Sequence, residues 1–67
     1  MKSYQIVVRG EFGALLSQAF SDLKIEPIQG ETVLTAVDVD SSGLYRILDR
    51  LRDFAVEIES FREVRAV

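Results

Sequence analysis

The sequence predicts an α+β domain in which two helices cover one face of a four-stranded antiparallel sheet. The spacing of apolar residues changes twice from a period of two to a period of about 3.6 and back. Short turns with glycine or polar residues separate the segments. The 67 residues are too few for a second domain, since domains usually have ~50–200 residues. We therefore expect one domain over residues 1–67, in the order strand, helix, strand, strand, helix, strand.

The first half of the chain predicts a strand, a short helix and one arm of a hairpin. Residues 4–8 are rich in β-branched and aromatic types, alternate in polarity and stop at Gly10. In residues 12–23 the apolar positions recur at the three- and four-residue spacing that places one stripe on a helix. Residues 23–28 return to a strand, and Pro27 favours the edge of the sheet because it has no N–H to donate.

The second half predicts the other arm of the hairpin and a longer helix. Gly30 can supply the positive φ that a hairpin turn requires before the strand of residues 32–39. Asp40 has the short side-chain oxygen that is typical of the residue before a helix. The apolar stripe of that helix spans residues 44–55.

The last predicted strand, residues 56–64, is irregular. Its strong apolar residues, Ile58 and Phe61, are three positions apart and fall on opposite faces of a regular strand. Either a bulge near Ser60 changes this alternation, or both faces of the strand are partly covered.

This order of elements is the split βαβ plan of ferredoxin-like domains. Right-handed crossovers place both helices on one face and give the strand order 4-1-3-2. The second strand then lies at an edge of the sheet, in agreement with its proline.

One face of such a sheet is left open, and its side chains indicate whether the domain associates. The alternation along the strands assigns Val7, Leu34, Ala36 and Phe61 to this open face. They predict an apolar patch, and small domains often gain burial by oligomerisation. We therefore expect the protein to bind itself, or another protein, through this face or the strand edges. Scattered surface hydrophobes on a half-polar face are the alternative.

The composition excludes several kinds of chemistry. The chain has no Cys, His, Trp or Asn, which removes thiolate ligands, an imidazole base and glycosylation acceptors. A net charge of −3 disfavours nucleic acid and anionic membranes as partners. No apolar run has the length of a signal-peptide core or a membrane span. We expect a cytoplasmic protein that is not an enzyme and has no cofactor or metal.

Two groups of charged residues are interpreted as solvated surface. Glutamates alternate along the last strand, where they keep a sheet edge soluble. Arginines of the second helix are interleaved with aspartates at spacings that favour ion pairs. They are Arg46, Arg50 and Arg52, with Asp49 and Asp53.

Residues 10–16, which read Gly-Glu-Phe-Gly-Ala-Leu-Leu, resemble the strand-to-helix turn of ACT-type regulatory domains, which share this order of elements. The resemblance implies that a small ligand, often an amino acid, binds near this turn at a subunit interface. It selects Glu11, Phe12 and Gly13 as the binding residues, although Phe12 stands where the family has a proline. The alternative is a glycine turn that only packs a helix on a strand.

Over its whole length the chain is also similar to small stand-alone ferredoxin-like proteins common in actinobacterial genomes. Residues 8–10, 30–34 and 48–53 carry this likeness. It implies the fold and leaves the function open.

Overall fold

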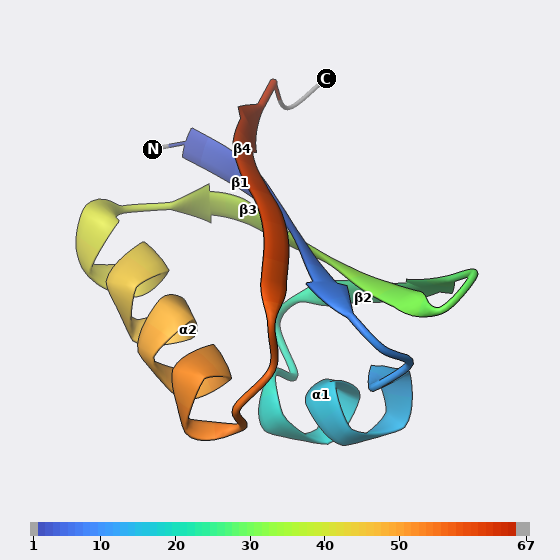
Figure 1. Cartoon of the computed structure of the whole chain (residues 1–67). Coiled ribbons are helices and arrows are strands. Elements are labelled where there is room, and N and C mark those ends of the chain that lie inside the picture. Colours follow the sequence, from blue (N-terminus) through green and yellow to red (C-terminus); the bar gives the residue numbers. More distant parts are fainter. Residues whose placement is uncertain (1, 66–67) are drawn as a thin grey trace.

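The computed structural model describes residues 2–65 and contains the expected elements in the expected order (Figure 1). The strands are β1 (Lys2–Arg9), β2 (Lys24–Ile28), β3 (Glu31–Val39) and β4 (Ile58–Val64), and the helices are α1 (Gly13–Ala19) and α2 (Ser41–Asp53). Every strand pair is antiparallel, and the order is β2-β3-β1-β4. This is the predicted order read from the other edge, so the α+β class and the strand order are confirmed. Pro27 lies in an edge strand, as predicted.

The first helix is shorter than the apolar spacing predicts. α1 ends at Ala19 because Phe20 has a non-helical backbone, with φ −126° and ψ 83°. Leu23, which continues the apolar spacing, packs against the core from the segment before β2. No side chain caps the start of α1. Because a helix this short is unstable alone, the burial of Leu16 and Phe20 holds it in place.

The second helix agrees with its sequence signals. The Asp40 carboxylate accepts a hydrogen bond from the N–H of Gly43 at 2.7 Å, as an N-cap residue does. Arg50 and Arg52 lie in the last turn, where cations complement the helix dipole. The buried residues of this helix are Leu44, Ile47 and Leu51.

The core joins both helices to the two central strands, β1 and β3. The strands contribute Ile6, Val8, Leu34 and Ala36, and the helices contribute Leu16, Phe20, Ile47 and Leu51. The side of the sheet that carries these strand residues is the core face, and the other side is the predicted open face.

The structure reverses the two predicted faces of β3. The sequence assigns Leu34 and Ala36 to the open face, but they are 0% and 1% exposed in the core. Leu34 pairs with the buried Ile6 of β1, and directly paired residues project to the same face of a sheet. The prediction was wrong because Val33 and Val37 make the other phase equally apolar, so alternation did not identify the core face.

β4 contains a bulge near Ser60, one of the two alternatives that the sequence left open. Its register against β1 shifts between Ser60 and Ile58, which leaves Glu59 as the extra residue. Beyond the bulge Phe61 pairs with Ile6, and Ile58 also pairs with a buried residue of β1. Ile58 and Phe61 therefore both lie on the core face, and the assignment of Phe61 to the open face was wrong.

Candidate functional site

The turn between β1 and α1 is tied to the β2–β3 hairpin by its own polar groups. The Glu11 carboxylate accepts a hydrogen bond from the N–H of Gly30 at 3.2 Å. The N–H of Phe12 donates to Thr32 Oγ1 at 2.9 Å, and that hydroxyl donates to the carbonyl oxygen of Gly10 at 2.8 Å. Of the three residues that the ACT resemblance selects, Glu11 and Phe12 therefore have polar groups engaged within the chain.

Packing also accounts for the glycine at the start of this turn. Gly10 has a φ of +99°, and a Cβ there would lie 2.5 Å from Cε2 of Phe12. At Gly13 a Cβ would meet nothing within 4 Å. The close approach of Phe12 to Gly10 supports the interpretation that this glycine turn serves to pack α1 against the sheet. Sequence reasoning missed Thr32, which is fully buried and joins the turn to the hairpin.

The predicted apolar patch on the open face is not assembled. Of its four residues only Val7 lies on that face, where it is partly exposed and pairs with Val33. Val37, four residues after Val33 on β3, is 57% exposed. The open face therefore has apolar residues, but not the predicted ones.

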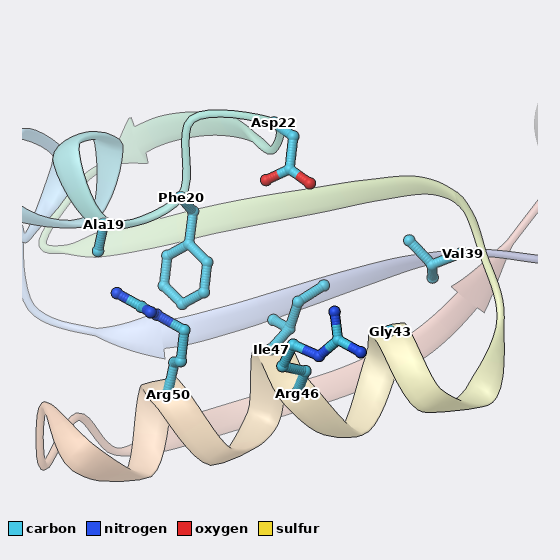
Figure 2. Close-up of a pocket in the computed structure, with 8 residues that line it drawn as sticks. All are labelled: Ala19, Phe20, Asp22, Val39, Gly43, Arg46, Ile47 and Arg50. Atoms are coloured by element: carbon cyan, nitrogen blue, oxygen red, sulfur yellow. The ribbon is translucent and has the colours of Figure 1, made fainter.

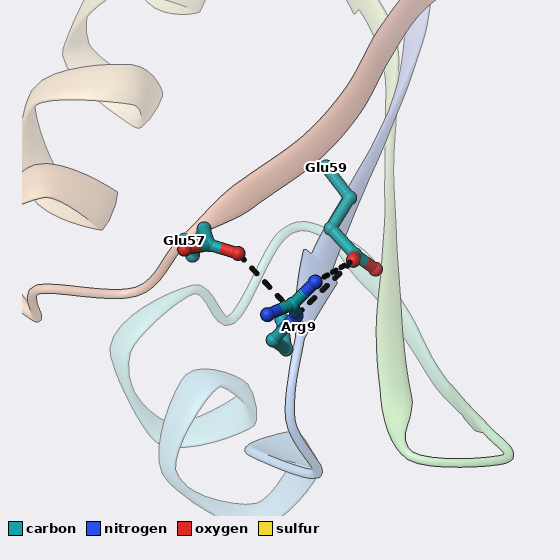
Figure 3. A network of polar contacts seen from close by, with 3 residues as sticks. All are labelled: Arg9, Glu57 and Glu59. Atoms are coloured by element: carbon teal, nitrogen blue, oxygen red, sulfur yellow. Dashed lines mark hydrogen bonds and ion pairs between the residues drawn. The ribbon is translucent and has the colours of Figure 1, made fainter.

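Charged side chains cluster where β1 ends and β4 begins (Figure 3). Arg9 Nε lies 3.3 Å from Glu57 Oε2 and 3.2 Å from Glu59 Oε2, and Arg9 Nη2 lies 3.2 Å from Glu59 Oε2. A side-chain hydrogen bond with Glu59, and then its negative charge, raise the pKa of Glu31. The same hydrogen bond, together with Arg9, lowers the pKa of Glu59. Arg9 therefore links β1 to the start of β4 across the bulge, and Glu31 of β3 adds a second negative charge beside Glu59.

β4 is the most exposed strand of the sheet. Six of its seven residues are exposed, and Val64 is only partly buried. Among residues 2–65, β4 pairs with β1 alone, so its outer edge has backbone N–H and C=O groups that no other described strand pairs with. The opposite edge, β2, has five residues and contains Pro27, which cannot donate a hydrogen bond. β4 is therefore the edge better suited to pairing with another chain.

Three largely apolar side chains lie on the core face of β4 or beside it on β1, and we call them the β4 strip: Tyr4, Ile58 and Phe61. Ile58 is 41% exposed and Phe61 is 45% exposed. The rings of Tyr4 and Phe61 are stacked, with centroids 5.4 Å apart and planes at 18°. The β4 strip is apolar surface that the helices leave uncovered.

A hollow of about 180 Å³ lies between the end of α1 and the side of α2 (Figure 2). Phe20 and Ile47, which are 5% and 9% exposed, contribute apolar side chains to it. Arg46 and Arg50 line it from α2, and Asp22 lines it from the loop after α1. The Arg50 guanidinium lies over the Phe20 ring, with its carbon 5.6 Å from the ring centroid.

The arginines of α2 do not all behave as the sequence predicts. Arg52 lies 3.4 Å from Asp49 in the expected ion pair. Arg46 and Arg50 form no ion pair with any residue in the range 2–65. Like charges four residues apart destabilise a helix by about 0.2–0.5 kcal/mol. The four-residue spacing of Arg46 and Arg50 is the sequence signal that could have indicated the hollow that these arginines line.

The comparisons with known proteins identify a family without an assigned function. A family model described as Domain of unknown function (DUF8691) matches residues 3–62. No curated protein and no solved structure matches the chain. The likenesses to ACT-type domains and to actinobacterial proteins stay predictions.

None of the helices within residues 2–65 is long and apolar enough to cross a membrane. Within this range no three His, Cys, Asp or Glu side chains are grouped so that they could hold a metal ion.

Proposed function

The chain belongs to the family described as Domain of unknown function (DUF8691), and we propose that it acts as a non-catalytic interaction module in the cytoplasm that self-associates through the β4 edge. The exposure of β4 carries this proposal, since six of its seven residues are exposed. A free strand edge is a template for pairing with another strand. The β4 strip beside it offers the additional apolar burial that a domain of this size lacks.

The proposal takes both helices to cover the same face of the sheet. The shared core cluster supports this, because Leu16 of α1 and Ile47 of α2 are buried with the same strand residues. In this arrangement the helices do not extend over the core face of β4, as the exposure of Ile58 and Phe61 indicates.

The charges near the β4 edge favour a second copy of the chain as the partner. Glu63 lies 3.5 Å from Lys2, and Glu59 lies 3.2 Å from Arg9. Basic side chains of β1 therefore compensate these carboxylates, which reduces the repulsion between two β4 edges. Antiparallel pairing about a two-fold axis near Phe61 would extend the sheet through both copies and bring the two β4 strips together.

The oligomeric state of a Phe61→Arg variant tests the proposal. We expect the parent protein to have the mass of a dimer in light scattering after size exclusion, and the variant to have the mass of a monomer. Phe61 is 45% exposed, so the domain should remain folded, which circular dichroism checks. Leu15→Arg, at a residue of α1 that is 47% exposed, is the matched control and should stay dimeric.

Two results would contradict the proposal. One is a parent protein that is monomeric throughout the micromolar range. The other is a Phe61→Arg variant that is folded and still dimeric, because self-association would then use another surface. A monomeric parent that copurifies with a different protein would likewise contradict self-association. It would indicate that the module binds that protein instead of a second copy.

Sensing of a small ligand at the turn after β1 is the alternative function, and the hydrogen bonds of that turn argue against it. A thermal-shift panel of amino acids and small carboxylates tests it, because a specific ligand at ~100 times its dissociation constant adds ~2.7 kcal/mol of stability. Stabilisation that Glu11→Ala abolishes would favour this alternative.

A further inference from the structure

The hollow between α1 and α2 has the dimensions of a site for a small molecule. Its volume is about 180 Å³, against the ~150 Å³ of an engineered apolar cavity that binds benzene in another protein. The nearly buried side chains of Phe20 and Ile47 offer apolar contacts. A six-membered ring or a branched aliphatic chain therefore matches the space.

The two arginines beside the hollow favour an anionic ligand. Arg46 and Arg50 lie one helical turn apart on α2, and Figure 2 shows both guanidinium groups beside the hollow. Neither guanidinium has an ion-pair partner in the described part of the chain, although the protein has a net charge of −3. A guanidinium matches the planar geometry of a carboxylate with two parallel hydrogen bonds. Contact with the Phe20 ring restricts Arg50 to the rim.

Asp22 limits the number of negative charges that the hollow accepts. Its carboxylate lies across the hollow from α2 in Figure 2. It repels a second anionic group on a ligand whose first group is held by the arginines. We propose that the hollow binds a small organic monocarboxylate with an apolar body, oriented with its carboxylate toward Arg46 and Arg50.

This proposal does not depend on self-association. Residues of α1, α2, β3 and the loop after α1 line the hollow, and no residue of β4 does. The Phe61→Arg variant should therefore bind the ligand as the parent does. Failure of either proposal leaves the other standing.

Benzoate is the probe, and benzyl alcohol is the control with the same ring and no charge. We expect millimolar benzoate to shift the backbone amide resonances of Ala19, Phe20 and Gly43 and to raise the melting temperature. Benzyl alcohol should bind about tenfold more weakly, because it lacks the charge-assisted hydrogen bonds. Equal binding of the two compounds, or no shift with benzoate, would overturn the proposal.

Opposite effects of two kinds of variant locate the site. Loss of both rim arginines in an Arg46→Gln, Arg50→Gln variant should weaken benzoate binding by about tenfold or more. Asp22→Asn should strengthen it, because a repulsive charge is removed. Arg52→Gln on the same helix and Glu11→Ala in the turn after β1 are the controls and should bind as the parent does. Weakening by either control equal to that of the double variant would place the binding elsewhere.

Discussion

Replacement of Leu34 by alanine tests which face of β3 is buried. Leu34 is 0% exposed and belongs to the cluster that joins the sheet to both helices. Truncation of a fully buried leucine costs about 2–5 kcal/mol, because apolar burial is lost and a cavity remains. A domain of this length has a stability of roughly 3–10 kcal/mol. A loss of about 3 kcal/mol would therefore remove roughly 30% or more of this stability.

Val33→Ala is the matched control for this substitution. Val33 is the neighbouring residue on the same strand, but it lies on the open face and is only partly buried. Its truncation should cost about 0.5–1 kcal/mol, in proportion to the smaller apolar area that it removes from water. The order of the two losses would be reversed if the face assignment from the sequence were right.

Urea denaturation followed by circular dichroism measures both losses. The protein concentration must be fixed, because the proposed self-association would make stability depend on it. Equal slopes against urea show that the loss is one of stability and not of compactness. A loss of 3 kcal/mol should lower the melting temperature by roughly 12–24 °C. Equal destabilisation by the two variants would refute our account of the core.

Three further predictions concern the turn after β1 and the neighbouring carboxylates of Glu31 and Glu59. Thr32→Val should destabilise the domain by about 1–3 kcal/mol in urea denaturation, because it leaves a backbone N–H of the turn without its buried acceptor. Gly10→Ala should destabilise the domain by about 1–3 kcal/mol, because Gly10 has a positive φ and a Cβ there would clash with the Phe12 ring. Gly13→Ala should stabilise the domain by about 0.4–1 kcal/mol, because a Cβ there meets nothing and alanine restricts the unfolded chain. Glu31→Gln should raise the melting temperature at neutral pH, where it removes a negative charge beside Glu59, and this gain should disappear in acid.

The direction of the pH effect follows from the raised pKa of Glu31. A raised pKa in the folded state contributes stability at low pH, and this contribution is lost as the pH rises through that pKa. Glutamine cannot ionise and avoids the loss. A gain that is constant with pH would contradict this cause.

For the turn, Thr35→Val on the open face is the control, and equal losses from Thr32→Val and Thr35→Val would contradict the role of the hydroxyl.

The sequence alone determined the order and type of the elements, because these depend on local chemistry. A change in the spacing of apolar residues distinguishes strands from helices wherever each of these elements buries only one of its faces. Pro27 indicated an edge strand because it lacks a donor. Asp40 indicated a helix start because its side chain can accept from an N–H of the first turn, as it does. The three-residue spacing of Ile58 and Phe61 also left open the bulge that β4 contains.

Only the tertiary structure decided which sides of these elements are buried and which side chains meet. β3 is apolar on both faces, so pairing with β1, and not its own pattern, places Leu34 in the core. The exposure of Phe61 depends on how far the helices extend over the sheet. The hollow brings Asp22 to residues of α2, which are distant in sequence. Such relations depend on the packing of whole elements, because the short-range preferences of a chain do not specify which distant side chains become neighbours.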